Sequence, residues 1–94
     1  MKTVKDMIVS RMEIHEKLYN TQLTCVGINL QLCQNDEFRT LDSLENLEIQ
    51  LGENDWISGE FYCLDYNDEP VWFEYNYDFD CWEEHKLPKF YSKY

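Results

Sequence analysis

The side chains best placed to do chemistry lie in an acidic run near the end of the chain. Polar residues recur there at every second position: Glu74, Asn76, Asp78 and Asp80. Because the side chains of a β-strand alternate between its two faces, these residues would share one face, at steps of about 6.7 Å. Such a row can bind the basic side chains of a partner, or serve in acid–base catalysis if a pocket separates the pKa values of two carboxylates. The spacing by itself predicts an acidic strand face.

The cysteines and histidines do not have the spacing of a metal site. Structural zinc sites use ligand pairs about two to four residues apart, whereas the cysteines here are widely separated: Cys25, Cys33, Cys63 and Cys81. We therefore predict no metal and no cofactor, and we interpret the cysteines as reduced thiols. Cys25 and Cys33 would lie on one extended strand, too far apart to form a disulfide with each other. His15 is expected on a helix, at the boundary of the core.

The sequence contains no catalytic motif. Its glycines, Gly27, Gly52 and Gly59, are too dispersed for a phosphate-binding loop, and neither a Gly-x-Ser-x-Gly element nor a recognisable Cys/His nucleophile pair occurs. Abundant carboxylates do not make an acid–base pair without a pocket. We therefore expect a binding protein and not an enzyme.

The composition indicates a folded but strongly acidic chain of 94 residues, enough for one domain spanning residues 1–94. Hydrophobic residues make up 44%, although the formal net charge is −11. Residues 35–84 contain sixteen carboxylates and a single base, Arg39. This charge repels nucleic acid and anionic membranes, so we expect direct contact with neither, and it attracts basic partners. Since there is neither an apolar leader nor a run long enough to span a bilayer, we expect a cytoplasmic protein.

A helix is predicted at the start of the chain, followed directly by a strand. Thr3 and Asp6 have the spacing of a capping box, and apolar residues follow at helical intervals, which predicts a helix over about residues 3–19. Apolar residues then alternate between residues 22 and 33. The side chains expected to face the core from this strand are Val26, Ile28, Leu30 and Leu32.

Two later segments are compatible with short helical turns. Residues 34–45 combine turn formers with apolar residues at helical spacing, and residues 81–86 could form a second turn that Pro88 would end.

Three further strands form two predicted hairpins. The strands cover residues 47–51, 56–66 and 71–80, and each of the loops between them has four residues, 52–55 and 67–70. Equal loop lengths would place Leu51 opposite Trp56 and Tyr66 opposite Val71. The resulting apolar face would contain Leu47, Ile49, Leu51, Trp56, Tyr62, Leu64, Tyr66, Val71, Phe73, Tyr75, Tyr77 and Phe79, interrupted by Ser58 and Glu60. The predicted fold class is α+β, an N-terminal helix packed on a four-stranded, mainly antiparallel sheet.

The opposite face of this predicted sheet would carry the candidate binding residues. The predicted partner contacts are Phe61, Asp65, Trp72, Glu74, Asn76, Asp78 and Asp80. With one polar residue per about 6.7 Å, and Asn76 uncharged, this row has less than half the charge density of a DNA strand. Aromatic anchors ringed by polar groups are typical of protein interfaces, which favours a basic protein as the partner. The alternative is an ordinary solvated face whose apolar groups are covered by residues 34–45 or by the C-terminal tail.

The end of the chain also resembles a known group of proteins. Small acidic bacterial immunity proteins, which neutralise a cognate nuclease toxin, often end in an aromatic and acidic strand, and the run from Phe73 to Trp82 resembles that ending. The YezG-like immunity family is similar in its late strand, its tyrosine–acid pair and the Trp that follows, over residues 56–82. The resemblance implies inhibition by occlusion of the toxin. Phage anti-defence proteins, such as anti-CRISPR and anti-restriction inhibitors, are similarly short and acidic.

The leading functional prediction is therefore an immunity protein that binds a basic nuclease toxin and blocks its active-site or substrate groove. The alternative is a phage-encoded inhibitor of a nucleic-acid-binding defence complex, in which the same carboxylates act as nucleic-acid mimics. A toxin gene immediately upstream would favour the first prediction, and a phage operon would favour the second.

Overall fold

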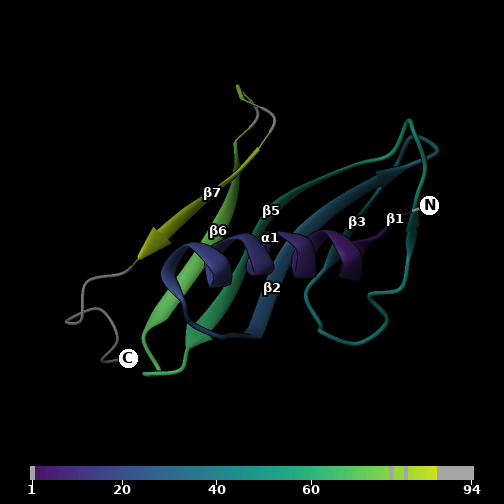
Figure 1. Cartoon of the computed structure of the whole chain (residues 1–94). Coiled ribbons are helices and arrows are strands. Elements are labelled where there is room, and N and C mark those ends of the chain that lie inside the picture. Colours follow the sequence, from purple (N-terminus) through teal and green to yellow (C-terminus); the bar gives the residue numbers. More distant parts are fainter. Residues whose placement is uncertain (1, 77, 80, 87–94) are drawn as a thin grey trace.

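The computed structural model of the chain is an α+β structure in which one helix packs against a five-stranded antiparallel sheet (Figure 1). It describes residues 2–76, 78–79 and 81–86. The elements are β1 (Lys2–Thr3), α1 (Val4–Tyr19), β2 (Leu23–Gln34), β3 (Glu37–Leu41), β4 (Gln50–Leu51), β5 (Trp56–Asp65), β6 (Pro70–Asn76) and β7 (Cys81–Lys86). The main sheet has the order β3-β2-β5-β6-β7, and β1 pairs with β4 in a separate two-stranded sheet. The predicted fold class is confirmed, but the main sheet has five strands where four were expected.

The helix α1 begins and ends at the residues that its caps select. Thr3 Oγ1 accepts a hydrogen bond from the Asp6 N–H, and the Asp6 carboxylate accepts one from the Thr3 N–H, each 3.1 Å long. The predicted capping box is therefore confirmed. At the other end Asn20 adopts a left-handed conformation with φ 51°, which stops the helix after Tyr19.

The segment before β5 lies at the start of α1 and not in the main sheet. The N–H groups of Val4 and Lys5 donate to the carbonyls of Ile49 and Leu47, at 3.0 and 2.9 Å. The first N–H groups of a helix have no partner within it, so residues 47–51 supply acceptors that the helix needs. The predicted strand over these residues shrinks to β4, and its pairing with Trp56 is wrong.

Most of the predicted core side chains of β2 are buried, but the strand contains a bulge. The buried ones are Ile28, Leu30 and Leu32. Val26 is 50% exposed, because the pairing with β5 shifts between Cys25 and Gly27 and leaves Val26 outside the ladder. The core prediction for Val26 is therefore wrong, since strict alternation fails where a bulge adds a residue.

The turn between β5 and β6 decides which side chains of β5 enter the core. The Asp65 N–H donates to the Glu69 carbonyl at 3.0 Å, and the Asp65 carboxylate accepts from the N–H groups of Asn67 and Glu69, at 2.8 and 3.0 Å. Asp68, left-handed with φ 59°, completes a three-residue loop over 66–68. The predicted four-residue loop is wrong, and an odd loop length reverses the faces of β5 relative to β6.

The register of this hairpin places Phe61 opposite Phe73 and Cys63 opposite Val71. Val71 and Phe73 face the core as predicted. The sequence predicts Phe61 on the acidic face, but its side chain is fully buried and stacks on Phe73 with 4.8 Å between ring centroids. That placement is wrong. The same reversal brings Ile57 and Cys63 into the core and turns Trp56, Ser58, Glu60, Tyr62 and Leu64 away from α1.

Both edge strands occupy segments that were expected to contain helical turns. β3 lies within residues 34–45, and β7 pairs with β6 along its whole length, from Val71 opposite Lys86 to Asn76 opposite Cys81. Trp82 of β7 packs on Phe61 with ring centroids 5.4 Å apart. Burial of this ring against the sheet outweighs a weak local preference for a helical turn.

A polar bridge joins the end of α1 to the edge strand β7. The His15 Nδ1 lies 2.9 Å from Glu84 Oε2, and an Arg11 Nη lies 3.4 Å from Glu84 Oε1. The Arg11 Nε also donates to the Trp82 carbonyl at 3.3 Å. His15 is 1% exposed, deeper than its predicted place at the core boundary. The bridge gives a buried imidazole the polar partner that burial requires.

Candidate functional site

The face of the main sheet turned away from α1 carries a row of carboxylates. Glu60 of β5 lies opposite Glu74 of β6, which lies opposite Glu83 of β7. Asn29 of β2 lies opposite Glu60 and extends the row by one polar side chain. Neighbouring strands are about 4.8 Å apart, so this row runs across the sheet and is denser than the row predicted along a single strand.

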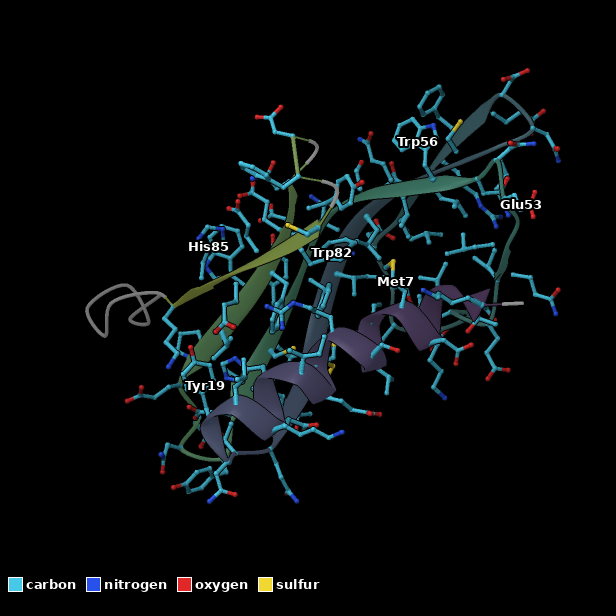
Figure 2. All side chains as sticks on the ribbon, turned by 45° about the horizontal axis from the view of Figure 1, so that its top comes forward. Met7, Tyr19, Glu53, Trp56, Trp82 and His85 are labelled. Atoms are coloured by element: carbon cyan, nitrogen blue, oxygen red, sulfur yellow. The ribbon has the colours of Figure 1, made fainter. Side chains whose placement is uncertain are left out.

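A row of rings lies next to the carboxylates on the same face. Tyr62 is opposite Trp72, and Trp72 is opposite His85. The rings of Trp72 and His85 stack with 4.3 Å between centroids, and Tyr62 lies 6.3 Å from Trp72. Figure 2 shows His85 on the side of β7 away from α1. These rings place aromatic side chains directly beside the carboxylates.

The acidic row works against folding. Like charges directly opposite each other on neighbouring strands destabilise a sheet, and Glu74 faces a carboxylate on each side. One contact reduces the repulsion, since the Asn76 side-chain amide donates to the Glu83 carboxylate. His85 Nε2 lies 3.4 Å from Glu74 Oε1. Glu74 nevertheless keeps 53% of its side chain exposed, so it is available to a partner.

Tyr62 connects the aromatic row to the acidic row. Burial raises the pKa of the Tyr62 hydroxyl, and the nearby Glu60 carboxylate raises it further. The protonated hydroxyl therefore lies where it can donate to Glu60 at neutral pH. The Trp72 indole N–H, by contrast, is shielded and has no hydrogen-bond partner within the described residues, so one donor on this face is not satisfied by the rest of the described chain.

A hollow of about 250 Å³ opens beside the acidic row. The pairing of β6 with β5 ends at Glu60 and Glu74, while β5 continues alongside β2, so the strands diverge there (Figure 1). At Gly59, with φ 106°, a Cβ would lie 2.3 Å from the Asn29 carbonyl oxygen, so this close approach requires glycine. The lining residues are Asn29, Gln31, Ser58, Gly59, Glu60, Glu74 and Tyr75. Two carboxylates surrounded by amides and a hydroxyl suit an ammonium or guanidinium group.

The structure brings together only part of the predicted binding set. Trp72, Glu74 and Asn76 share the face away from α1. Asp78 is exposed in the adjoining turn, where its N–H donates to the Asn76 side-chain oxygen at 2.9 Å. Asp80 lies outside the described residues.

The two other predicted residues are not on this face. Asp65 is at the far end of β5, where its carboxylate organises the turn before β6. Phe61 is buried beneath α1 and cannot contact a partner.

The sequence prediction also missed residues that belong to the face: Glu60, Tyr62, Glu83 and His85. Glu60 and Tyr62 were missed because the loop before β6 was taken one residue too long. Glu83 and His85 were missed because residues 81–86 do not alternate between apolar and polar side chains, so no local pattern identifies this strand.

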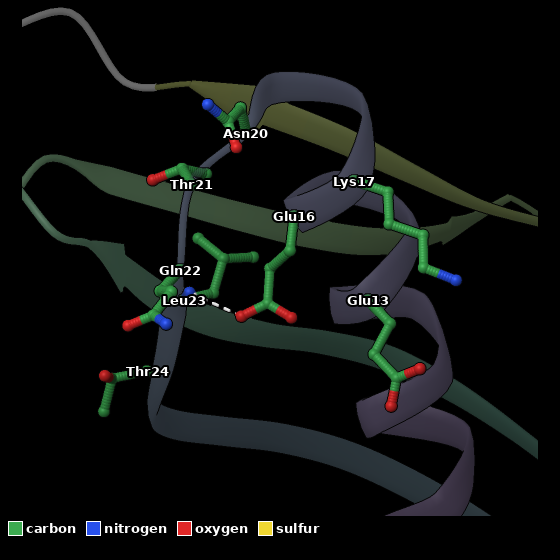
Figure 3. A pocket seen from close by; sticks show the side chains of 8 residues that line it. All are labelled: Glu13, Glu16, Lys17, Asn20, Thr21, Gln22, Leu23 and Thr24. Atoms are coloured by element: carbon green, nitrogen blue, oxygen red, sulfur yellow. Dashed lines mark hydrogen bonds between the residues drawn. The ribbon is translucent and has the colours of Figure 1, made fainter.

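The described chain also has a larger open concavity, of about 620 Å³, at the end of α1 (Figure 3). Its lining residues are Glu13, Glu16, Lys17, Asn20, Thr21, Gln22, Leu23 and Thr24. The Glu16 carboxylate accepts a hydrogen bond from the Leu23 N–H at 2.8 Å, drawn as a dashed line, and so fixes the connection from α1 to β2. No group of three or more potential metal ligands gathers anywhere in the described ranges.

The chain matches no family model, no curated protein and no solved structure. The resemblance to immunity proteins therefore stays a prediction. The described part of the chain contains no helix long and apolar enough to cross a membrane.

Proposed function

We propose that this chain is a small acidic inhibitory protein that acts in the cytoplasm and binds a basic protein on the sheet face opposite α1. In the leading form of the proposal it is an immunity protein that neutralises a nuclease toxin by covering its active-site or substrate groove. The observation that carries the proposal is the row Glu60, Glu74 and Glu83 lying in register beside the rings of Tyr62, Trp72 and His85.

The charge of the chain supports a basic partner. The formal net charge is −11, and nuclease surfaces that bind phosphate backbones are rich in Lys and Arg. Complementary charge can raise association rates from about 10⁵–10⁶ to 10⁸–10⁹ M⁻¹s⁻¹ at low salt. The adjacent rings supply the apolar anchors that slow dissociation once the partner is bound.

The energetics of the row also favour a binding role. Facing carboxylates at Glu60, Glu74 and Glu83 lower the stability of the sheet. Residues that break a local rule of stability in a folded protein are most often functional. Lys or Arg side chains of a partner entering between these carboxylates would remove the repulsion. This relief would make the free energy of binding more favourable.

A second candidate function is a phage anti-defence inhibitor that mimics nucleic acid. The observation that favours it is the direction of the acidic row. Across strands about 4.8 Å apart, the carboxylates approach roughly 70% of the axial charge density of one DNA strand, against less than half for a row along one strand. On the described strands only Glu60, Glu74 and Glu83 have this spacing, so the row would mimic only about three phosphates.

The proposal is tested by reversing the charge of the row. The face variant carries Glu60→Lys, Glu74→Lys and Glu83→Lys. The control variant carries Glu45→Lys, Glu48→Lys and Glu53→Lys, which are exposed positions outside the main sheet and give the same change in net charge. Each is compared with the wild-type chain for protection of cells that express the toxin encoded next to its gene, and for affinity to an inactive form of that toxin.

The face variant should lose on the order of 100-fold in affinity and all protection, because contacts and steering are both reversed. The control should lose only steering, within about tenfold and mostly in the association rate. Equal losses in the two variants would show that net charge and not this face determines binding. Protection against a defence complex but not against a toxin would transfer the proposal to the second candidate.

A further inference from the structure

Two of the four cysteines lie opposite each other on neighbouring strands. Cys25 of β2 is paired in register with Cys63 of β5. Paired residues of antiparallel strands have Cα atoms about 4.5 to 5.5 Å apart, and a disulfide needs about 4.4 to 6.8 Å. The register therefore places the Cα atoms of these two cysteines within the range that a disulfide needs, although the residues are far apart in the sequence.

The two thiols, facing each other across the strands, differ in environment. The Cys25 thiol donates to the Gly27 carbonyl at 3.7 Å, across the bulge at Val26. Cys63 is 1% exposed, whereas Cys25 is only half-buried. A small reagent can therefore reach Cys25 while Cys63 stays behind it.

The more exposed thiol, Cys25, is also the more acidic of the two. The neighbouring Cys63 thiol lowers the pKa of Cys25 to about 7, although burial acts in the opposite direction. The neighbouring Cys25 thiol and burial together raise the pKa of Cys63. Because the thiolate is the reactive form of cysteine, Cys25 has the character of an attacking thiol and Cys63 that of a resolving thiol.

The other two cysteines have no such arrangement. Cys33 is paired with Phe38 on one side and with Trp56 on the other, and Cys81 is paired with Asn76. Cys81 is exposed and Cys33 is buried. They provide an internal comparison for the reactivity of the pair.

We propose that Cys25 and Cys63 form a peroxide-reactive dithiol that closes reversibly to a disulfide within the chain. The Cys25 thiolate attacks one oxygen of hydrogen peroxide, which breaks the O–O bond and gives Cys25 sulfenic acid and hydroxide. The Cys63 thiol then attacks the sulfenic sulfur, the S–S bond forms, and the sulfenic oxygen leaves as water with the Cys63 proton. With hydrogen peroxide, two thiols are oxidised and one peroxide is reduced to two waters, the hydroxide taking up the proton that Cys25 lost.

The bond would join β2 to β5 directly beside the bulge. It closes a long loop that contains β3, β4 and the segment that caps α1, and cross-linking a long loop stabilises the folded state. The reduced and oxidised forms would differ in stability while keeping the same register. This inference does not depend on the proposed binding function.

The test uses a pair variant, Cys33→Ser with Cys81→Ser, which leaves only the two facing thiols. Its matched control, Cys25→Ser with Cys81→Ser, also has two thiols, Cys33 and Cys63, which are not paired in register. Both folded proteins are treated with one equivalent of hydrogen peroxide, alkylated and analysed by intact mass. Trypsin cleaves after Lys17, Arg39 and Lys86, so in the pair variant each thiol lies on its own peptide, 18–39 or 40–86.

The pair variant should lose both thiols together and yield one linkage between these two peptides, in monomers, reversed by dithiothreitol. Its melting temperature should rise by about 10 °C or more on oxidation. The control should form no linkage within the chain. If the pair variant folds poorly, the wild-type chain gives the same answer when the linked peptides are sequenced.

Three results would overturn the proposal. They are sulfinic acid at Cys25 with a free Cys63, cross-linked dimers in place of the internal bond, and thiols that survive peroxide as long as those of the control.

Discussion

The two faces of the main sheet are built from the same strands but differ in how their side chains are paired. On the face toward α1, Phe61 and Phe73 stack in a core without exposure, and Arg11 forms an ion pair with Glu84. On the other face carboxylates stand opposite carboxylates, next to rings that no described helix or strand covers. The first face is mainly apolar and pairs a basic with an acidic side chain, whereas the second brings three acidic side chains into register.

Under the proposed function, this difference separates the residues that stabilise the fold from the residues that bind a partner. The residues on the face toward α1 are explained by the stability of the fold, because they bury apolar surface and form a polar bridge. The three facing carboxylates do not stabilise the fold, because like charges opposite each other destabilise a sheet. Substitutions on the two faces should therefore affect different measurements, even where the residues are neighbours in the sequence.

The largest contrast is expected between Phe61 and Tyr62. Phe61→Ala should lower the free energy of unfolding by about 3–5 kcal/mol, because it leaves a cavity against Phe73 and Trp82. Tyr62→Ala, on the opposite face, should lower it by about 1 kcal/mol or less. Urea unfolding measures both. A larger loss for Tyr62→Ala would mean that the hairpin has the register of a four-residue loop.

A second contrast compares Glu84 with Glu83. Glu84→Ala should reduce the free energy of unfolding by about 1–3 kcal/mol, since it removes the partner of the buried His15. Glu83→Ala should be neutral or slightly stabilising, because it relieves the repulsion with Glu74. Chemical unfolding at neutral pH distinguishes them. If Glu83→Ala destabilised the chain more than Glu84→Ala did, β7 would present its other side to α1.

The smallest effect concerns the titration of Tyr62. Its raised pKa means that the folded state holds the phenolic proton more tightly than the unfolded state, whose pKa is near 10. The resulting stability is present below about pH 10 and is lost as the pH rises through the folded pKa. Tyrosinate absorbance, taken as the difference between wild type and Tyr62→Phe, should show a midpoint above that of free tyrosine. Glu60→Gln should lower this midpoint, and an unchanged midpoint would mean that Glu60 does not contact the hydroxyl.

Local patterns in the sequence predicted the elements whose contacts are local. The capping box at Thr3 and Asp6, the helix itself and the alternation of β2 depend on residues a few positions apart. The α+β class follows from the same patterns. The predicted acidic strand likewise places Trp72, Glu74 and Asn76 on one face of β6.

The rest depended on contacts that a local pattern does not contain. Residues 47–51 look like a strand, but acceptors for the first N–H groups of α1 hold them away from the main sheet. The face of β5 was mistaken because one carboxylate, Asp65, closes the turn a residue earlier than composition suggests. The acidic row joins three strands, so only the pairing of β5, β6 and β7 reveals it.

The three-residue turn at 66–68 sets a limit on how this chain can vary. Surface loops usually accept insertions and deletions at little cost. Here the gain or loss of a single residue would turn β5 over, moving Phe61 and Cys63 into water and Glu60 and Tyr62 beneath α1. Homologous chains should therefore keep the length of this turn while the loop over residues 42–46 varies freely. Among homologues, a fixed length at this one turn would identify the hairpin more reliably than any side chain in it.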